Sequence, residues 1–112
     1  MLPKNYRVVS PLVFQKILEQ GEQRENQYFK IFFKENNEDV SRFAVIINSK
    51  ICPSAVERNL MKRRIRNIVW KAIPSLPSGF DVLIFVKKDC LETPFQALKK
   101  QLEEFLMKIL RN

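Results

Sequence analysis

The amino-acid sequence predicts an α+β fold formed by a single domain over residues 1–112. Apolar residues recur at helical spacing in three segments, and three other segments are short and rich in aromatic and β-branched residues, which is typical of strands. The chain has 112 residues, 46% of them hydrophobic, which is enough for one two-layer core but not for two separate cores. The elements follow the order α-β-β-α-β-α, with room for one extra short strand.

The first half of the chain contains one predicted helix and two predicted strands. Ser10 or Pro11 opens the helix, and Gly21 supplies its stop. Residues 27–34 and 41–48 are strand-like, and residues 35–39 between them are polar. This pattern is interpreted as a β-hairpin.

The second half contains two predicted helices and one strand. A helix is expected over residues 55–72, ending before Pro74, followed by a loop over residues 74–79. Residues 80–87 are mostly apolar, as expected for a strand that is covered on both faces or lies at the centre of a sheet. Thr93 and Pro94 are expected to cap and start the last helix. Its buried stripe comprises Phe95, Leu98, Leu102, Phe105, Leu106 and Ile109.

The helix over residues 55–72 has the most informative charge pattern. Residues 58–66 contain five cations and no acid. Arg58, Lys62 and Arg66 lie on one face, with Asn59 and Arg63 beside them. The apolar side comprises Met61, Ile65, Ile68, Val69 and Ala72. A solvated face is the common explanation of a charge run, but solvated helices normally carry acidic partners at i,i+4, and these are missing here. Polyanion binding is therefore favoured, while Arg64 and Lys71 lie off this face and are assigned to solvent.

Composition narrows the function classes. A net charge of +8 and a pI near 9.8 indicate a nucleic acid or an anionic membrane as partner. The longest apolar stretches are strand-sized, and the first residues lack the apolar region of a secretory signal, so we expect a cytoplasmic protein without a membrane span. The chain has no His, and its two cysteines are far apart, which favours reduced structural thiols. No catalytic residue and no metal ligand is assigned.

The most specific motif of the sequence runs from Ser49-Lys50 to Ala55-Val56-x-Arg58-Asn59-x-x-Lys62-Arg63-x-x-Arg66. It is similar to the signature helix of the protein subunit of bacterial ribonuclease P. Supporting matches are Leu2-Pro3-Lys4-Asn5, Phe14-Gln15 followed by Gly21, Arg42-Phe43, and Phe80-Asp81-Val82-Leu83. Order and spacing agree over nearly the whole chain.

The resemblance implies a two-layer, ribosomal-protein-like α/β sandwich with a left-handed β-α-β crossover around the signature helix. It implies that the protein binds the catalytic RNA and the 5′ leader of precursor tRNA, so that the leader is removed by RNA catalysis. Magnesium is then the cofactor, bound mainly by the RNA, and the protein is expected to be monomeric. The implied RNA-binding residues are Lys50, Arg58, Asn59, Lys62, Arg63 and Arg66, and the implied leader cleft contains Phe14 and Phe32. Phe29, Phe33, Phe80, Phe85, Phe95 and Phe105 are left in the core or unassigned.

Two positions depart from the family pattern. Leu60 replaces a common Arg in the Arg-Asn-Arg run, so that one RNA contact is lost or the position is packed, and Leu18 replaces an aromatic residue in the first helix. Two other functions stay open at this level. A ribosomal or RNA-chaperone protein would bind RNA without promoting cleavage. A metal-dependent nuclease would need converging carboxylates, and Glu35, Glu38 and Asp39 lie together only in a predicted turn.

Overall fold

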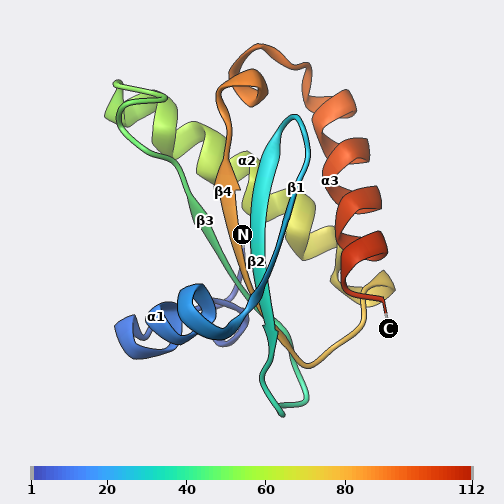
Figure 1. Ribbon diagram of the computed structural model, residues 1–112. Coiled ribbons are helices and arrows are strands. Elements are labelled where there is room, and N and C mark those ends of the chain that lie inside the picture. Colours follow the sequence, from blue (N-terminus) through green and yellow to red (C-terminus); the bar gives the residue numbers. More distant parts are fainter. Residues whose placement is uncertain (1, 112) are drawn as a thin grey trace.

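The computed structural model describes residues 2–111 and contains one four-stranded sheet (Figure 1). Its strands are β1 (Glu22–Glu25), β2 (Phe29–Glu35), β3 (Arg42–Ile46) and β4 (Phe80–Val86). The helices are α1 (Pro11–Gln20), α2 (Ala55–Ala72) and α3 (Phe95–Ile109), with short 3₁₀ turns η1 (Lys4–Tyr6), η2 (Ile73–Ser75) and η3 (Lys88–Glu92). The predicted α+β class is confirmed, and β1 is the extra short strand.

The predicted hairpin between residues 27–34 and 41–48 is wrong. The strand order is β1-β2-β4-β3, so β4 lies between β2 and β3 and pairs with both. The turn after β2 wraps around the start of β4, because the Asn36 amide nitrogen donates to the carbonyl of Gly79 at 2.8 Å. A polar turn between two strand-like segments indicates a reversal of chain direction, and it leaves open whether another strand enters between them.

The connection from β3 to β4 forms a β-α-β unit. The two strands are parallel neighbours, and α2 joins them. In Figure 1 both strands run upward, β4 lies to the right of β3, and α2 passes behind the sheet, which makes the crossover left-handed. The usual preference for right-handed crossovers would have predicted the opposite hand, so this feature was accessible only through the family resemblance.

The main core lies between the sheet and the pair α2 and α3. Alternate residues of β2 point to it, namely Phe29, Ile31 and Phe33, and so do Val82, Ile84 and Val86 of β4. The predicted apolar side of α2 is confirmed, since Met61, Ile65, Ile68, Val69 and Ala72 are all buried. On α3, Leu98, Leu102 and Leu106 are buried, while Phe95, Phe105 and Ile109 are partly buried against the same cluster. These two layers form the predicted sandwich.

The boundaries of the helices agree with the sequence in most places. Ser10 caps α1 by accepting a hydrogen bond from the Val13 amide at 3.4 Å, and α2 spans the predicted residues. Two local predictions are wrong. Thr93 was predicted to cap α3, but it follows the last residue of η3 and is the C-cap of that turn. Pro94, which has no side-chain acceptor, is the N-cap of α3 instead. The predicted loop over residues 74–79 begins inside η2.

Helix α1 packs on the other face of the sheet, against β2 and β4 (Figure 1). It ends where predicted, but Gly21 has an ordinary extended backbone with φ of −77°, so no left-handed cap is needed. The reason for glycine is space. A Cβ atom at this position would lie 2.5 Å from the carbonyl oxygen of Ile17 and 2.8 Å from that of Phe33. Gly21 therefore lets the chain pass closely between α1 and β2.

We expect Gly21→Ala to destabilise the protein by about 1–3 kcal/mol, because the added methyl group meets backbone atoms that cannot rotate away. The midpoint of urea unfolding should fall. Gln20→Ala, at the exposed neighbouring position, is the matched control and should leave the midpoint unchanged. An unchanged midpoint for Gly21→Ala would show that the close approach is not needed.

Candidate nucleic-acid interface

Three phenylalanines gather on the sheet face that carries α1. The ring of Phe85 lies 6.5 Å from that of Phe14 on α1 and 5.5 Å from that of Phe32 on β2, both in edge-to-face arrangement. All three side chains are half-buried. We call Phe14, Phe32 and Phe85 the aromatic surface. Phe32 and Phe85 point away from the main core because successive residues of a strand face opposite sides of the sheet, and Phe14 meets Phe85 from α1.

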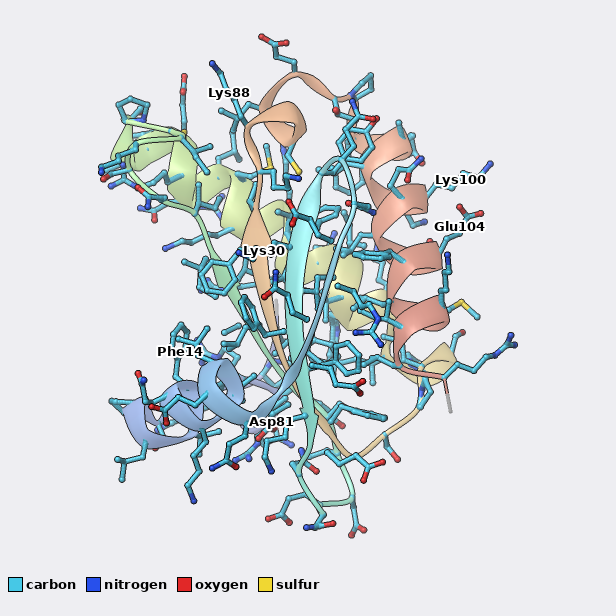
Figure 2. All side chains as sticks on the ribbon, in the orientation of Figure 1. Phe14, Lys30, Asp81, Lys88, Lys100 and Glu104 are labelled. Atoms are coloured by element: carbon cyan, nitrogen blue, oxygen red, sulfur yellow. The ribbon has the colours of Figure 1, made fainter. Side chains whose placement is uncertain are left out.

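Charged residues border the aromatic surface along the strands. The ammonium nitrogen of Lys30 lies 5.6 Å from the centre of the Phe32 ring, a cation–π contact. Figure 2 shows Lys30 in the middle of the sheet and Phe14 below it on α1. Lys30 pairs with Phe85 across the ladder between β2 and β4. The aromatic surface thus combines flat apolar rings with an adjacent cation.

At the other end of this face Asp81 binds two side chains. Arg42 donates through Nε and Nη2 to the two carboxylate oxygens, both at 2.8 Å, and the Asn36 side chain donates at 2.9 Å. Asp81 is 7% exposed and Arg42 31%. The hydrogen bonds to Asp81 raise the pKa of Arg42, against the opposing effect of burial. This network fixes the starts of β3 and β4 together.

A smaller ion pair joins two strand ends. Lys87 Nζ, just after β4, lies 2.5 Å from a carboxylate oxygen of Glu25 on β1 and also donates to the Asn26 carbonyl at 2.9 Å. The hydrogen bond that Lys87 donates to Glu25, together with the charge of Lys87, lowers the pKa of Glu25. The pair is exposed, so it is a minor source of stability that is lost as the pH falls through that pKa.

The second candidate surface is the basic flank of α2, formed by Lys62, Arg63 and Arg66. Arg63 is exposed, and the other two are half-buried. Among residues 2–111, the ion pairs join Arg24 to Glu22, Arg42 to Asp81 and Lys87 to Glu25, so none of them neutralises this flank. In Figure 1 the first turns of α2 extend past β3 at the edge of the sheet. The flank therefore presents unneutralised cations at the surface.

Arg58 has an intramolecular role that sequence reasoning missed. Its Nη1 donates to the carbonyl oxygens of Cys52 at 2.8 Å and Pro53 at 2.9 Å, so the side chain fastens the start of α2 to the preceding loop. Both carbonyls lie just before the helix, within reach of a side chain on its first turn. Arg58 therefore differs from the other cations, because part of its guanidinium is already occupied.

The remaining predicted residues lie around the start of α2. Asn59 is exposed on the first turns, and Lys50 is exposed in the turn after β3, where its backbone amide donates to the Asn48 side chain at 2.8 Å. Leu60 is 41% exposed and lines a shallow hollow beside Met61 and Leu91. Leu60 is thus partly packed rather than fully exposed.

Phe85 and Lys30 were missed as surface residues. A signal was present in β4, where Val82, Ile84 and Val86 face the main core and the residues between them must therefore face the other side. The continuous apolar run concealed this alternation. Strand β4 pairs with a strand on each side, and most of its residues are buried on both faces of the sheet, so both faces are apolar. Once α1 is placed, Phe85 belongs with Phe14 and Phe32.

The fold and these surfaces define a class, that of small basic α+β proteins with a cation-rich crossover helix on one face of the sheet and an aromatic surface on the other. The sequence matches the family described as Ribonuclease P over residues 2–110. It is 33% identical over 100 residues to the ribonuclease P protein component of Thermotoga petrophila, covering 86% of this chain and 85% of the relative. Identity to the corresponding component of Streptococcus agalactiae is 32% over 101 residues, covering 90% and 91%.

Solved structures of ribonuclease P proteins are similar to this chain in fold. The ribonuclease P protein of Thermotoga maritima superimposes with a TM-score of 0.84 at 27% identity, covering 91% of this chain and 96% of that protein. The protein from Staphylococcus aureus gives a TM-score of 0.81 at 25% identity, covering 95% of each chain.

The chain belongs to the ribonuclease P protein family. As such it is a protein component of the ribonucleoprotein endoribonuclease that processes the 5′ end of tRNA, in which catalysis is by the RNA subunit. Within residues 2–111, no helix is both long and apolar enough to cross a membrane.

Proposed function

We propose that this chain binds the catalytic RNA through the basic flank of α2 and the single-stranded 5′ leader of precursor tRNA through the aromatic surface. Leader removal is then promoted because the protein holds the substrate while the RNA cleaves it. The observation that carries the leader assignment is the grouping of Phe14, Phe32 and Phe85 around one patch of the sheet.

The properties of the aromatic surface suit a leader of variable sequence. Every base has a flat face, so stacking on Phe rings tolerates any sequence, with about 1–3 kcal/mol per stacked base. Lys30 beside Phe32 supplies a cation for a nearby phosphate. This combination suits a subunit that must accept many different precursors.

We assign binding of the RNA subunit to the basic flank, because the cations of this flank have no acidic partner among the described residues. Lys50 and Asn59 extend this surface, and Arg58 joins it through the part of its guanidinium that does not hold the loop. Phosphates bind such groups in a sequence-independent and salt-dependent way.

Magnesium is proposed to act mainly on the RNA. It screens phosphates and supports the chemistry there, whereas the acids Glu35, Glu38 and Asp39 of this chain are exposed around the turn after β2. We further propose that the protein acts in the cytoplasm and is a monomer before it joins the RNA. Light scattering of the free protein would test the monomer.

The leader assignment predicts a substrate-dependent effect. Phe14→Leu and Phe85→Leu remove the aromatic faces but keep apolar volume, so each should weaken the holoenzyme's affinity for a precursor with a leader by roughly tenfold, the value of one stacking contact. Affinity for leaderless tRNA should change less than twofold. The measurement is equilibrium binding of both substrates to the holoenzyme.

The matched control is Phe105→Leu, a partly buried phenylalanine on α3 at the opposite side of the sheet. It should affect neither substrate. Equal losses for both substrates with Phe14→Leu and Phe85→Leu would place these rings in general stability rather than in leader binding.

A further inference from the structure

An open hollow of about 710 Å³ lies between α2 and the start of α3, next to the basic flank and away from the aromatic surface. Its lining residues are Arg63, Arg64, Asn67 and Phe95. Arg63 belongs to the basic flank, but the other three had no assigned role, and sequence reasoning left Arg64 to solvent. The hollow forms because α2 and α3 pack against each other and Phe95 is the first residue of α3.

The lining combines three kinds of side chain on a small area. Arg63 and Arg64 are exposed, and neither takes part in an ion pair within the described chain. Phe95 is half-buried against the core, so one side of its ring is held in place. Asn67 contributes an amide, which can both donate and accept hydrogen bonds. The acid Glu57 lines the neighbouring hollow together with Arg64.

These groups match the parts of a nucleotide. Guanidinium groups bind phosphate through paired hydrogen bonds, an aromatic ring stacks a base, and an amide can bind a base edge or a 2′-hydroxyl. The volume also falls in the range of about 300–1,000 Å³ that is typical of small-ligand sites. A charged peptide would use the arginines but would leave the combination of ring and amide without a role.

We propose that this hollow binds one unstacked nucleotide of the catalytic RNA. The inference rests on the proposed function, since it requires α2 to face that RNA. The RNA subunit is favoured over the leader because Phe95 packs against the core on the α2 and α3 side, whereas the aromatic surface lies on the α1 side of the sheet. Arg63 connects the hollow with the basic flank, so a single RNA segment could contact both.

The test uses the full-length protein and a bacterial ribonuclease P RNA without substrate, with binding measured at several salt concentrations. Arg64→Ala should weaken binding about five- to tenfold and make the slope of log K against log salt shallower by about 0.7–0.9, the value of one phosphate contact. Phe95→Leu should weaken binding by a similar factor with an unchanged slope, since stacking releases no counterions. Lys100→Ala removes the same charge from the outer side of α3 and should change binding less than twofold (Figure 2).

Each alternative has its own result. Equal effects of Arg64→Ala and Lys100→Ala would mean that the net charge of the protein, and not the hollow, explains the loss of affinity. Wild-type affinity of a folded Phe95→Leu variant would contradict stacking of a base on Phe95. If Phe95→Leu fails to fold, Arg64→Ala still decides, because that side chain is exposed. A second titration measures how the holoenzyme formed with each variant binds precursor tRNA. If a variant binds the free RNA normally and loses affinity only for leader-bearing precursor, the nucleotide belongs to the leader and the proposal is overturned. Absence of RNA binding by the wild-type protein would instead contradict the proposed function itself.

Discussion

Simultaneous replacement of Lys62, Arg63 and Arg66 by Ala is expected to weaken binding of the catalytic RNA roughly 100-fold at moderate salt. Three solvent-exposed phosphate contacts at about 1 kcal/mol each, the net value of a typical hydrogen bond, account for this factor. The dependence on salt should weaken in parallel, with the slope of log K against log salt becoming shallower by about 2, from about 0.7 per lost phosphate contact. A filter-binding titration over a range of salt concentrations measures both quantities.

Arg58 is left out of this variant because its bonds to the Cys52 and Pro53 carbonyls give it a part in stability. The matched control replaces Lys99, Lys100 and Lys108 on α3, which removes the same net charge from another helix. A comparable loss of affinity for the control would mean that net charge, rather than the basic flank, governs binding. Unchanged binding of the α2 variant would remove that flank from the RNA interface.

Asp81→Ala is expected to give the largest loss of stability, about 2–4 kcal/mol. It would leave Arg42 without the carboxylate that accepts two of its hydrogen bonds, and Asn36 without one acceptor. Removing one partner of a buried pair typically costs about 3–5 kcal/mol, and the value is reduced here because water reaches part of Arg42. Urea unfolding followed by circular dichroism measures the change in the free energy of unfolding.

Asp39→Ala is the matched control, since this acid is exposed in the turn after β2 and should change stability by less than about 0.5 kcal/mol. If Asp81→Ala unfolds at the same urea concentration as the wild type, the network is not a source of stability. Asp81→Asn should fall in between, because the amide keeps one acceptor oxygen for Arg42 but loses the charge.

Much of the local structure follows from short-range patterns. The bounds of α1 and α2, the buried side of α2 and most of the α3 stripe were predicted correctly, because helical periodicity and capping depend on residues within a few positions of one another. The signature residues of α2 also identified the family. Thr93 was assigned wrongly as the cap of α3, because a Thr followed by Pro is typical of a helix start. Only the backbone shows that the helix begins one residue later, after Pro94.

The family resemblance implied the left-handed crossover, but the order of the strands was accessible only in the tertiary structure. The insertion of β4 between β2 and β3 depends on pairing between residues that are 39 to 57 positions apart in sequence, and no local pattern specifies these partners. The aromatic surface depends on that insertion, since Phe85 reaches Phe14 and Phe32 only from the central strand.

The sequence alone thus determined the helices, the charge of α2, the α+β class and the family, because each depends on residue types at fixed short spacings. The tertiary structure decided which side chains share a surface. In the folded chain Phe85 contacts Phe14 and Phe32, and Arg58 donates to backbone carbonyls before α2. The packing of α2 and α3 forms the hollow that is lined by Arg63, Arg64, Asn67 and Phe95. The physical reason is that such contacts depend on how helices and strands pack, which is set by the free energy of the whole core rather than by neighbouring residues.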